Sequence, residues 1–339
     1  MIGFPRLFNA NQDINVMPLH TVILPSGRDR VVVMDSPLPI PKVFVKLISL
    51  SMVRPTTLAK DAALEKTCMV YPGVTIDIDQ VNRFKQVCGY DINGSGVPAA
   101  FIQSLFISIM SRFISSSCFP ISPMGLIQTG QSFELVQPVS PGLKIDLYCR
   151  ILDMARTEKG IVSRFLMEAA VAGDHPETKA FANSDEKELV WQGIATYLTR
   201  SKARKPKEKK PPPRDTPLPV KEIIDVPGNT GRRYAAVSRD FNPHHLYTWT
   251  ALPMGFKHPI AHGIWSMARA GASLEKAAGY PILTGMDGAL KLPIFMPAQI
   301  TLGYTFSGAN ARFELRDKAR GVPHLKGSFR FSPTPTDTK

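Results

Sequence analysis

Residues 238–263 bring together side chains that can move protons. The stretch reads SRDFNPHHLYTWTALPMGFKHPIAHG and contains Asp240, His245 and His262. The residue before a proline is pushed out of helical conformations, so Asn242 and Pro243 predict a turn. Asp240 and His245 flank this turn, and we expect their side chains to converge. A carboxyl group and an imidazole in that arrangement can hold a water molecule and exchange protons with it near neutral pH.

The end of the stretch adds a group that can bind developing negative charge. The segment PIAHG, residues 259–263, leads into an apolar run that we expect to be helical. The N–H of Gly263 then lies in the first turn, where unpaired donors and the positive end of the helix dipole occur. Glycine also lets a ligand carbonyl approach the backbone closely. A proton-transferring pair with an oxyanion donor can add water to a carbon β to a carbonyl, or remove it.

Each of these residues also has a purely structural interpretation. Asp240 can cap the turn, His245 can be an ordinary surface histidine, and Gly263 can serve tight helix packing. Only the combination favours chemistry, because the three features fall within one short stretch.

The elements that position the stretch belong to a pattern that occurs twice. Residues 97–114 and 259–279 each predict a helix that is apolar nearly all round, which must be enclosed by a sheet. Period-two alternation follows both helices, within residues 135–151 and 289–307, and indicates antiparallel strands with one dry face. The segments PVSPGLKIDL and PIFMPAQITL share their proline spacing, so we infer a duplicated module with an α+β architecture.

A basic, proline-rich segment separates the two modules. We expect an N-terminal extension at 1–60, a first module at 61–200, a linker at 201–219, a second module at 220–332 and a disordered tail at 333–339. The linker SKARKPKEKKPPPRDTPLP lacks backbone donors at its prolines, and its like charges repel.

Composition narrows the class of protein. The 339 residues carry a formal net charge of +13, much of it in the linker, without a basic helix interleaved with aromatic residues. This distribution argues against nucleic-acid binding and suits a phosphate-bearing substrate. The four cysteines show no CxxC pair, so we expect buried free thiols. With no secretion signal and no membrane span in the sequence, we expect a cytoplasmic protein.

The stretch resembles the (R)-specific enoyl-CoA hydratases and MaoC-like acyl dehydratases. Their signature runs Ser-Gly-Asp-x-Asn-Pro-x-His and later Pro-Ile-x-His-Gly. This chain matches with Ser238, Asp240, Asn242, Pro243 and His245, then with residues 259–263 except for the variable position. The resemblance is specific from about 234 to 306 and weaker from about 71 to 200. It is absent from 1 to 60.

The resemblance implies a double hotdog fold, in which each half is a long helix wrapped by an antiparallel sheet. It also implies a hydro-lyase of fatty acid metabolism that adds water in syn fashion across the C2=C3 bond of 2-enoyl thioesters. His245 would act on the water, Asp240 on the α-carbon proton, and the Gly263 N–H on the thioester oxygen. His262, Asn242 and Ser238 would complete the substrate site.

The resemblance implies no cofactor and no metal. In the first half, Asp91 and Asn93 have no Pro-x-His after them, so that half is expected to be catalytically silent. The substrate is a thioester of CoA or of acyl carrier protein. A monomer and a homodimer both remain open, because two hotdog repeats can pair within one chain.

One position departs from the family signature. Arg239 replaces its glycine. An inward side chain would pair with Asp240 and impair its acid function, whereas an outward one could contact a CoA phosphate. We favour the outward orientation. Because the glycine indicates a positive φ, which strains arginine, a local backbone change is a third option.

Two further activities are compatible with the sequence. A hotdog thioesterase would hydrolyse the same class of substrate. A non-catalytic acyl-thioester-binding protein would bind it without turnover.

Overall fold

The structure is a computed structural model. It describes residues 67–174 without 95 and 124, then 176, 186–200, 216–279 and 282–332, with short pieces at 20–21, 30–34, 50 and 53–58. Most of the predicted extension, residues 201–215 of the predicted linker and the tail 333–339 lie outside the described residues. The predicted domain boundaries therefore stay predictions.

The same order of elements occurs twice along the chain. The first half contains β3 (Thr67–Thr75), α2 (Ile78–Cys88), α3 (Ala99–Ile114), β4 (Leu126–Leu135), β5 (Lys144–Thr157), β6 (Gly160–Val171) and β7 (Leu189–Arg200). The second half contains β8 (Val220–Val226), α4 (Thr230–Ser238), α6 (Gly263–Ala277), β9 (Leu283–Leu290), β10 (Ala298–Ser307), β11 (Asn310–Asp317) and β12 (Pro323–Phe331). Only the second half inserts η3 (Pro243–His245), α5 (Thr248–Ala251) and η4 (Leu252–Met254) between its two longer helices.

The strands of both halves form one sheet with a symmetric order. Along the main path the order is β2-β3-β5-β6-β7-β4-β9-β12-β11-β10-β8. The halves join where β4 pairs with β9 in antiparallel fashion, with Ser132 opposite Asp287. Outward from this seam each half repeats the same arrangement, and β1 (His20–Thr21) and β2 (Arg30–Val33) add to the first half at β5 and β3.

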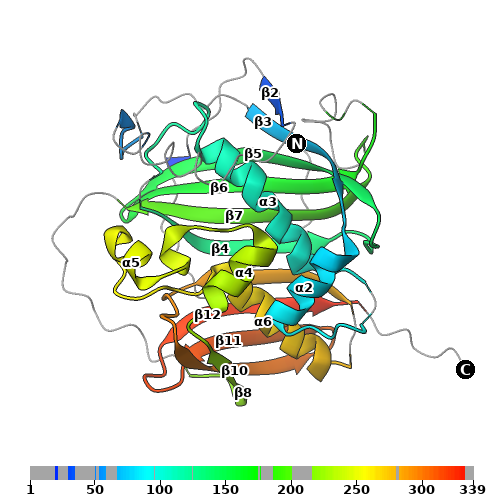
Figure 1. The fold of residues 1–339 in the computed structure, drawn as a ribbon, viewed down its shortest axis with the longest axis vertical. Helices are drawn as coiled ribbons and strands as arrows, with labels where there is room; N and C mark the ends of the chain where they lie inside the picture. The colour runs from blue at the N-terminus through cyan, green and yellow to red at the C-terminus, as the bar shows by residue number, and fades with distance from the viewer. Residues whose placement is uncertain are drawn as a thin grey trace, which may run out of the picture.

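The helices α2, α3, α4 and α6 lie on one face of the curved sheet (Figure 1). Both long helices turn fully buried side chains toward it, among them Phe101 and Phe106 on α3, and Met267 and Leu274 on α6. This explains why neither helix has a clean polar stripe, since each is enclosed by the sheet and by the other helices. The predicted α+β, double hotdog architecture is confirmed.

The two shorter of these helices, α2 and α4, were not among the elements expected from the sequence. Each of them ends in a left-handed residue, Gly89 after α2 and Arg239 after α4. They pack against each other across the two halves. Trp265 of α6 donates its indole N–H to the Val87 carbonyl of α2 (3.2 Å), which ties the central helix of the second half to the first half.

Two other expectations from composition can be compared with the structure. All four cysteines are buried free thiols, as predicted. Among the described residues, no helix is long and apolar enough to cross a bilayer.

Candidate functional site

The left-handed end of α4 places Asp240. Arg239 has φ 61°, and its backbone N–H donates to the Ala235 carbonyl, which ends the helix. The positive φ that a glycine signature indicates is therefore kept, although arginine occupies the position. Its side chain is exposed and makes no ion pair with Asp240 in the part of the chain that the structure describes. The outward orientation is confirmed, and a shift to another backbone conformation is not found.

A chain of hydrogen bonds then fixes the turn. The Ser238 hydroxyl donates to the Tyr234 carbonyl (2.9 Å) and accepts from the Asp240 N–H (3.2 Å). Oδ1 of Asp240 accepts from the Asn242 N–H (3.3 Å). Asn242 has φ −57° and ψ 125°, the extended conformation expected before proline. Ser238 is buried, so its hydroxyl holds the backbone of the turn.

His245 is held at the end of η3. Its Nδ1–H donates to the Ile260 carbonyl (2.7 Å), because a carbonyl oxygen can only accept. The tautomer leaves a lone pair on Nε2. Backbone hydrogen bonds position this carbonyl in turn. The Ile260 N–H donates to the backbone carbonyl of His244 (3.0 Å), and Ile260 forms an isolated antiparallel β-bridge with Phe295. His245 is buried, so the interpretation as a surface histidine is wrong.

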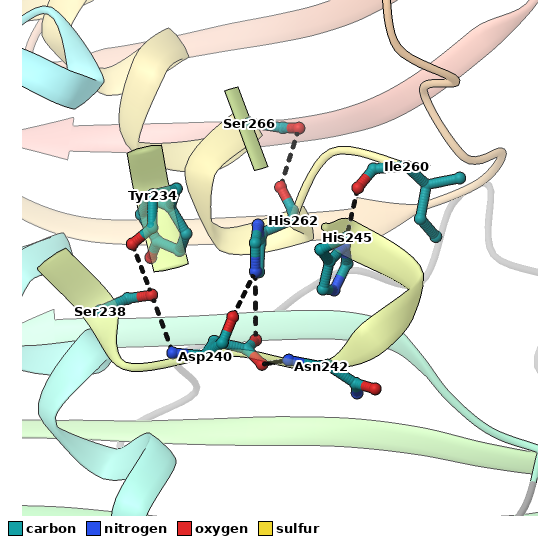
Figure 2. A network of polar contacts seen from close by, with 8 residues as sticks. All are labelled: Tyr234, Ser238, Asp240, Asn242, His245, Ile260, His262 and Ser266. Atoms are coloured by element: carbon teal, nitrogen blue, oxygen red, sulfur yellow. Dashed lines mark hydrogen bonds and ion pairs between the residues drawn. The ribbon is translucent and has the colours of Figure 1, made fainter. Parts of the chain in front are cut away.

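His262 links the segment around Asp240 to the start of α6. It is the N-cap residue of α6, and its Nε2–H donates to the backbone carbonyl of Asp240 (2.9 Å). The same nitrogen lies 3.8 Å from Oδ2 of Asp240. Its ring stacks on His245, with ring centres 3.6 Å apart, and contacts Tyr234 on α4 at 4.8 Å. Figure 2 shows Asp240 below the two imidazoles, with Ser238 and Asn242 on either side.

Burial keeps these histidines neutral. Desolvation, reinforced by the neighbouring His262, lowers the pKa of His245 to about 3. Burial likewise lowers the pKa of His262 to about 3, and that of His244, whose ring centre lies 4.1 Å from the ring of His245. At neutral pH, the free nitrogen of His245 is therefore available as a base.

Gly263 opens α6, as predicted. It is the first residue of the helix, and the His262 side chain does not cap the first-turn N–H groups. A Cβ on Gly263 would lie 2.7 Å from Cδ1 of Leu290. A side chain at position 263 would have to displace the end of the Leu290 side chain on β9, so packing favours glycine whether or not the N–H binds substrate. The structural and functional interpretations of Gly263 both stand.

Sequence patterns miss two tyrosines that interact with site residues, Tyr234 by ring contact with His262 and Tyr197 through the charge of Asp240. Tyr234 lies one helical turn before Ser238, a spacing that could have drawn attention to it. Tyr197 comes from β7 of the first half, and burial, together with the charge of Asp240, raises its pKa. No local signal connects residues 197 and 240, so only the join between the halves brings them together. His258, by contrast, is exposed.

The site also offers a possible donor set for a metal ion. Ligand atoms of Asp240, His245 and His262 lie within 4.8 Å of one another. Two imidazoles and a carboxylate can hold a divalent cation. Nε2 of His262 would first have to give up its proton and its hydrogen bond to Asp240. The expectation that the chemistry needs no metal stays a prediction.

Known proteins show the same combination of sequence and fold. Residues 204–326 match the model of the family described as "MaoC like domain". The 3-hydroxyacyl-thioester dehydratase X of Mycobacterium tuberculosis is 26% identical over 258 residues, which cover 75% of this chain and 86% of the relative.

Solved structures share this fold over most of the chain. The crystal structure of HtdX from Mycobacterium tuberculosis is 22% identical, with a TM-score of 0.64 over 78% of this chain and 100% of that one. The MaoC-like dehydratase from Phytophthora capsici is 17% identical, with a TM-score of 0.61 over 78% and 95% of the two chains. Peroxisomal multifunctional enzyme type 2 from Drosophila melanogaster is 13% identical, with a TM-score of 0.60 over 78% and 48%.

Proposed function

We propose, from the premise that this chain belongs to the MaoC-like dehydratase family, that it is a hydro-lyase acting on acyl thioesters. In finer detail, it would add water reversibly across the C2=C3 bond of 2-enoyl thioesters to give (R)-3-hydroxyacyl thioesters. The observation that carries this proposal is the convergence of Asp240, His245 and His262 within 4.8 Å at the N-terminus of α6.

His245 acts as the base toward water. Its Nδ1–H is engaged by the Ile260 carbonyl, and its lowered pKa leaves Nε2 unprotonated. A water molecule held between Nε2 and the Asp240 carboxyl gives one proton to Nε2 as its oxygen bonds to C3. Asp240, in its protonated form, supplies the proton that adds to C2 on the same face and is left as the carboxylate. Transfer of the proton from the imidazolium to the carboxylate afterwards restores the pair.

The remaining predicted residues support these two. Addition at C3 places negative charge on the thioester oxygen, and the Gly263 N–H at the positive end of α6 would stabilise it. Ser238 and His262 act on Asp240 from opposite sides, through its N–H and its carbonyl respectively. The half-buried Asn242 side chain is proposed to face the substrate. The first half would be silent, since Asp91 is exposed.

Hydration of crotonyl-CoA, measured as loss of the conjugated thioester absorbance, tests the proposal. Asp240→Asn and His245→Ala should each lower the rate by at least ~100-fold, the usual scale for losing a proton-transfer group. Asp91→Asn is the matched control, because the Asp91 carboxylate also accepts from the N–H two residues ahead, that of Asn93 (3.0 Å), but in the silent half.

Other outcomes would contradict the proposal. Wild-type-like hydration in Asp240→Asn would exclude the mechanism. Release of free CoA thiol without hydration would identify a thioesterase. Tight binding without turnover, unchanged in Asp240→Asn, would identify a non-catalytic binder.

A further inference from the structure

An exposed aromatic pair lies directly beside the candidate site. Tyr247 and Trp249 follow His245 along the chain, in the segment that only the second half contains. Their side chains are 43% and 71% exposed. The rings stack with their centres 5.8 Å apart and an angle of 15° between their planes. The helix that carries Trp249, α5, projects from the edge of the molecule (Figure 1).

A role in packing the core does not explain a tryptophan at position 249. The other two tryptophans, Trp191 and Trp265, are 0% and 3% exposed, as expected for the largest apolar side chain. Trp249 rests one face on Tyr247 and remains 71% exposed. Its opposite face is therefore open to solvent. An indole exposed to this degree next to a reaction site is typical of a binding surface.

One cation contacts the aromatic pair, and the same segment of the chain is basic. The Arg232 guanidinium lies 4.7 Å from the centre of the Tyr247 ring, and its Nη1 donates to the Leu246 carbonyl (2.9 Å). Residues 229–258 contain four lysines and arginines, and Asp240 is the single acid. Three of these bases have exposed side chains, namely Arg233, Arg239 and Lys257. The segment is thus suited to a ligand that combines a flat aromatic ring with anionic groups.

We propose that Tyr247 and Trp249 bind the purine base of a CoA thioester, and that Arg232 and the exposed bases of the same segment bind its phosphates. The inference rests on the proposed function, which requires a thioester to reach Asp240 and His245. It selects CoA over acyl carrier protein, because both carry the thioester on a pantetheine arm but only CoA has a base. Stacking on an indole needs no base-specific hydrogen bonds, since every base has a π-face.

Kinetics with full and truncated substrates test this site. The KM for crotonyl-CoA is compared with the KM for the N-acetylcysteamine thioester, which lacks the nucleotide. In Trp249→Ala the KM for crotonyl-CoA, divided by the KM for the N-acetylcysteamine thioester, should rise roughly tenfold. This is the scale expected for losing one stacked base. Leu252→Ala is the matched control, because Leu252 is also apolar, 57% exposed and in the same segment, but offers no ring. Its ratio should equal that of the wild type.

Two kinetic outcomes would overturn the proposal. If Trp249→Ala raised both KM values by the same factor, the residue would have no role toward the nucleotide. If it impaired the acyl-carrier-protein thioester more than the CoA thioester, the aromatic pair would be a docking surface for the carrier protein.

A binding measurement separates this inference from the proposed function. Adenosine 3′,5′-bisphosphate, which carries the base and phosphates without the thioester, should quench the fluorescence of Trp249 and leave Trp249→Phe unquenched. Quenching with no hydration of any thioester would refute the hydratase and leave the nucleotide site standing. Absence of quenching at millimolar bisphosphate, with normal hydration, would refute the nucleotide site alone.

Discussion

The two halves of the molecule end their first helices in the same way and then diverge. Gly89 after α2 and Arg239 after α4 are both left-handed, with φ 83° and 61°. In each half a carboxylate then accepts from the N–H two residues ahead, Asp91 from Asn93 and Asp240 from Asn242. The backbone turn is therefore common to both.

The residues around the turn differ between the halves. In the first half, buried Tyr90 comes directly after Gly89, which moves Asp91 one position further on and out to solvent. In the second half Asp240 itself comes directly after the left-handed residue, and the inserted η3 brings His245 back over α4. One residue of register thus decides whether the carboxylate faces solvent or an imidazole.

The glycine beneath η3 offers the sharpest test of this difference. A Cβ on Gly231 would lie 1.9 Å from the His245 carbonyl oxygen. Gly231→Ala must therefore displace η3, and we expect about a 100-fold loss of hydration rate, as displacements near 1 Å cause in active sites. Rate and circular dichroism are measured together, so that misfolding is recognised.

The corresponding residue of the first half is the control. Counted back from the left-handed residues, position 231 matches Val81, which is fully buried, and η3 has no counterpart between α2 and α3 among the described residues. Val81→Ala should cost roughly 2 kcal/mol of stability, since it removes two buried methyl groups. The folded fraction should keep its activity. Equal activity losses in the two variants would show that the halves do not differ as described.

Acid should destabilise the protein because the second half contains three buried, neutral histidines. His244, His245 and His262 each have a pKa of about 3 in the folded protein, against 6.5 when exposed. Between these values the unfolded chain binds more protons, so stability falls as pH decreases from 7 toward 5, by roughly 1 kcal/mol per pH unit for each histidine.

Glu275 acts in the opposite direction. Burial raises its pKa to about 8, so the folded state takes up its proton first on acidification. Urea unfolding at pH 7 and pH 5 measures the balance. The fall in stability should be smaller in His262→Gln and larger in Glu275→Gln. A stability that rises toward pH 5 in the wild type would contradict the assignment.

The smallest expected change in stability comes from substitutions at the two left-handed positions, 89 and 239. Arg239→Gly should stabilise the protein by about 1 kcal/mol, because glycine adopts a positive φ without steric cost. Gly89→Ala should destabilise it by a similar amount, and its Cβ would meet Arg269 at 3.3 Å. Urea denaturation of the two variants measures both changes. The two changes in unfolding free energy must have opposite signs, since φ is positive at both positions.

Local patterns predicted much of this protein. The apolar helices, the alternating strands and the turn at Asn242 depend on neighbouring residues, so the sequence alone indicated them. The duplicated module was inferred from similar segments at a similar offset. The proximity of Asp240 and His245 was predictable too, because a single turn separates them. The helices α2 and α4 escaped prediction although α2 carries local signals, since Asp77 caps its N-terminus and Gly89 ends it.

Only the tertiary structure decided which nitrogen of His245 is free, because the Ile260 carbonyl that engages Nδ1 is positioned by pairing with the loop around Phe295. It also decided that Gly231 lies under the His245 carbonyl. These contacts join residues that are not neighbours in sequence, and their geometry depends on how the elements of the second half pack. The sequence by itself determined the reactive groups and the turn between them. Packing within the second half determined which nitrogen of His245 is free and which way its ring lies.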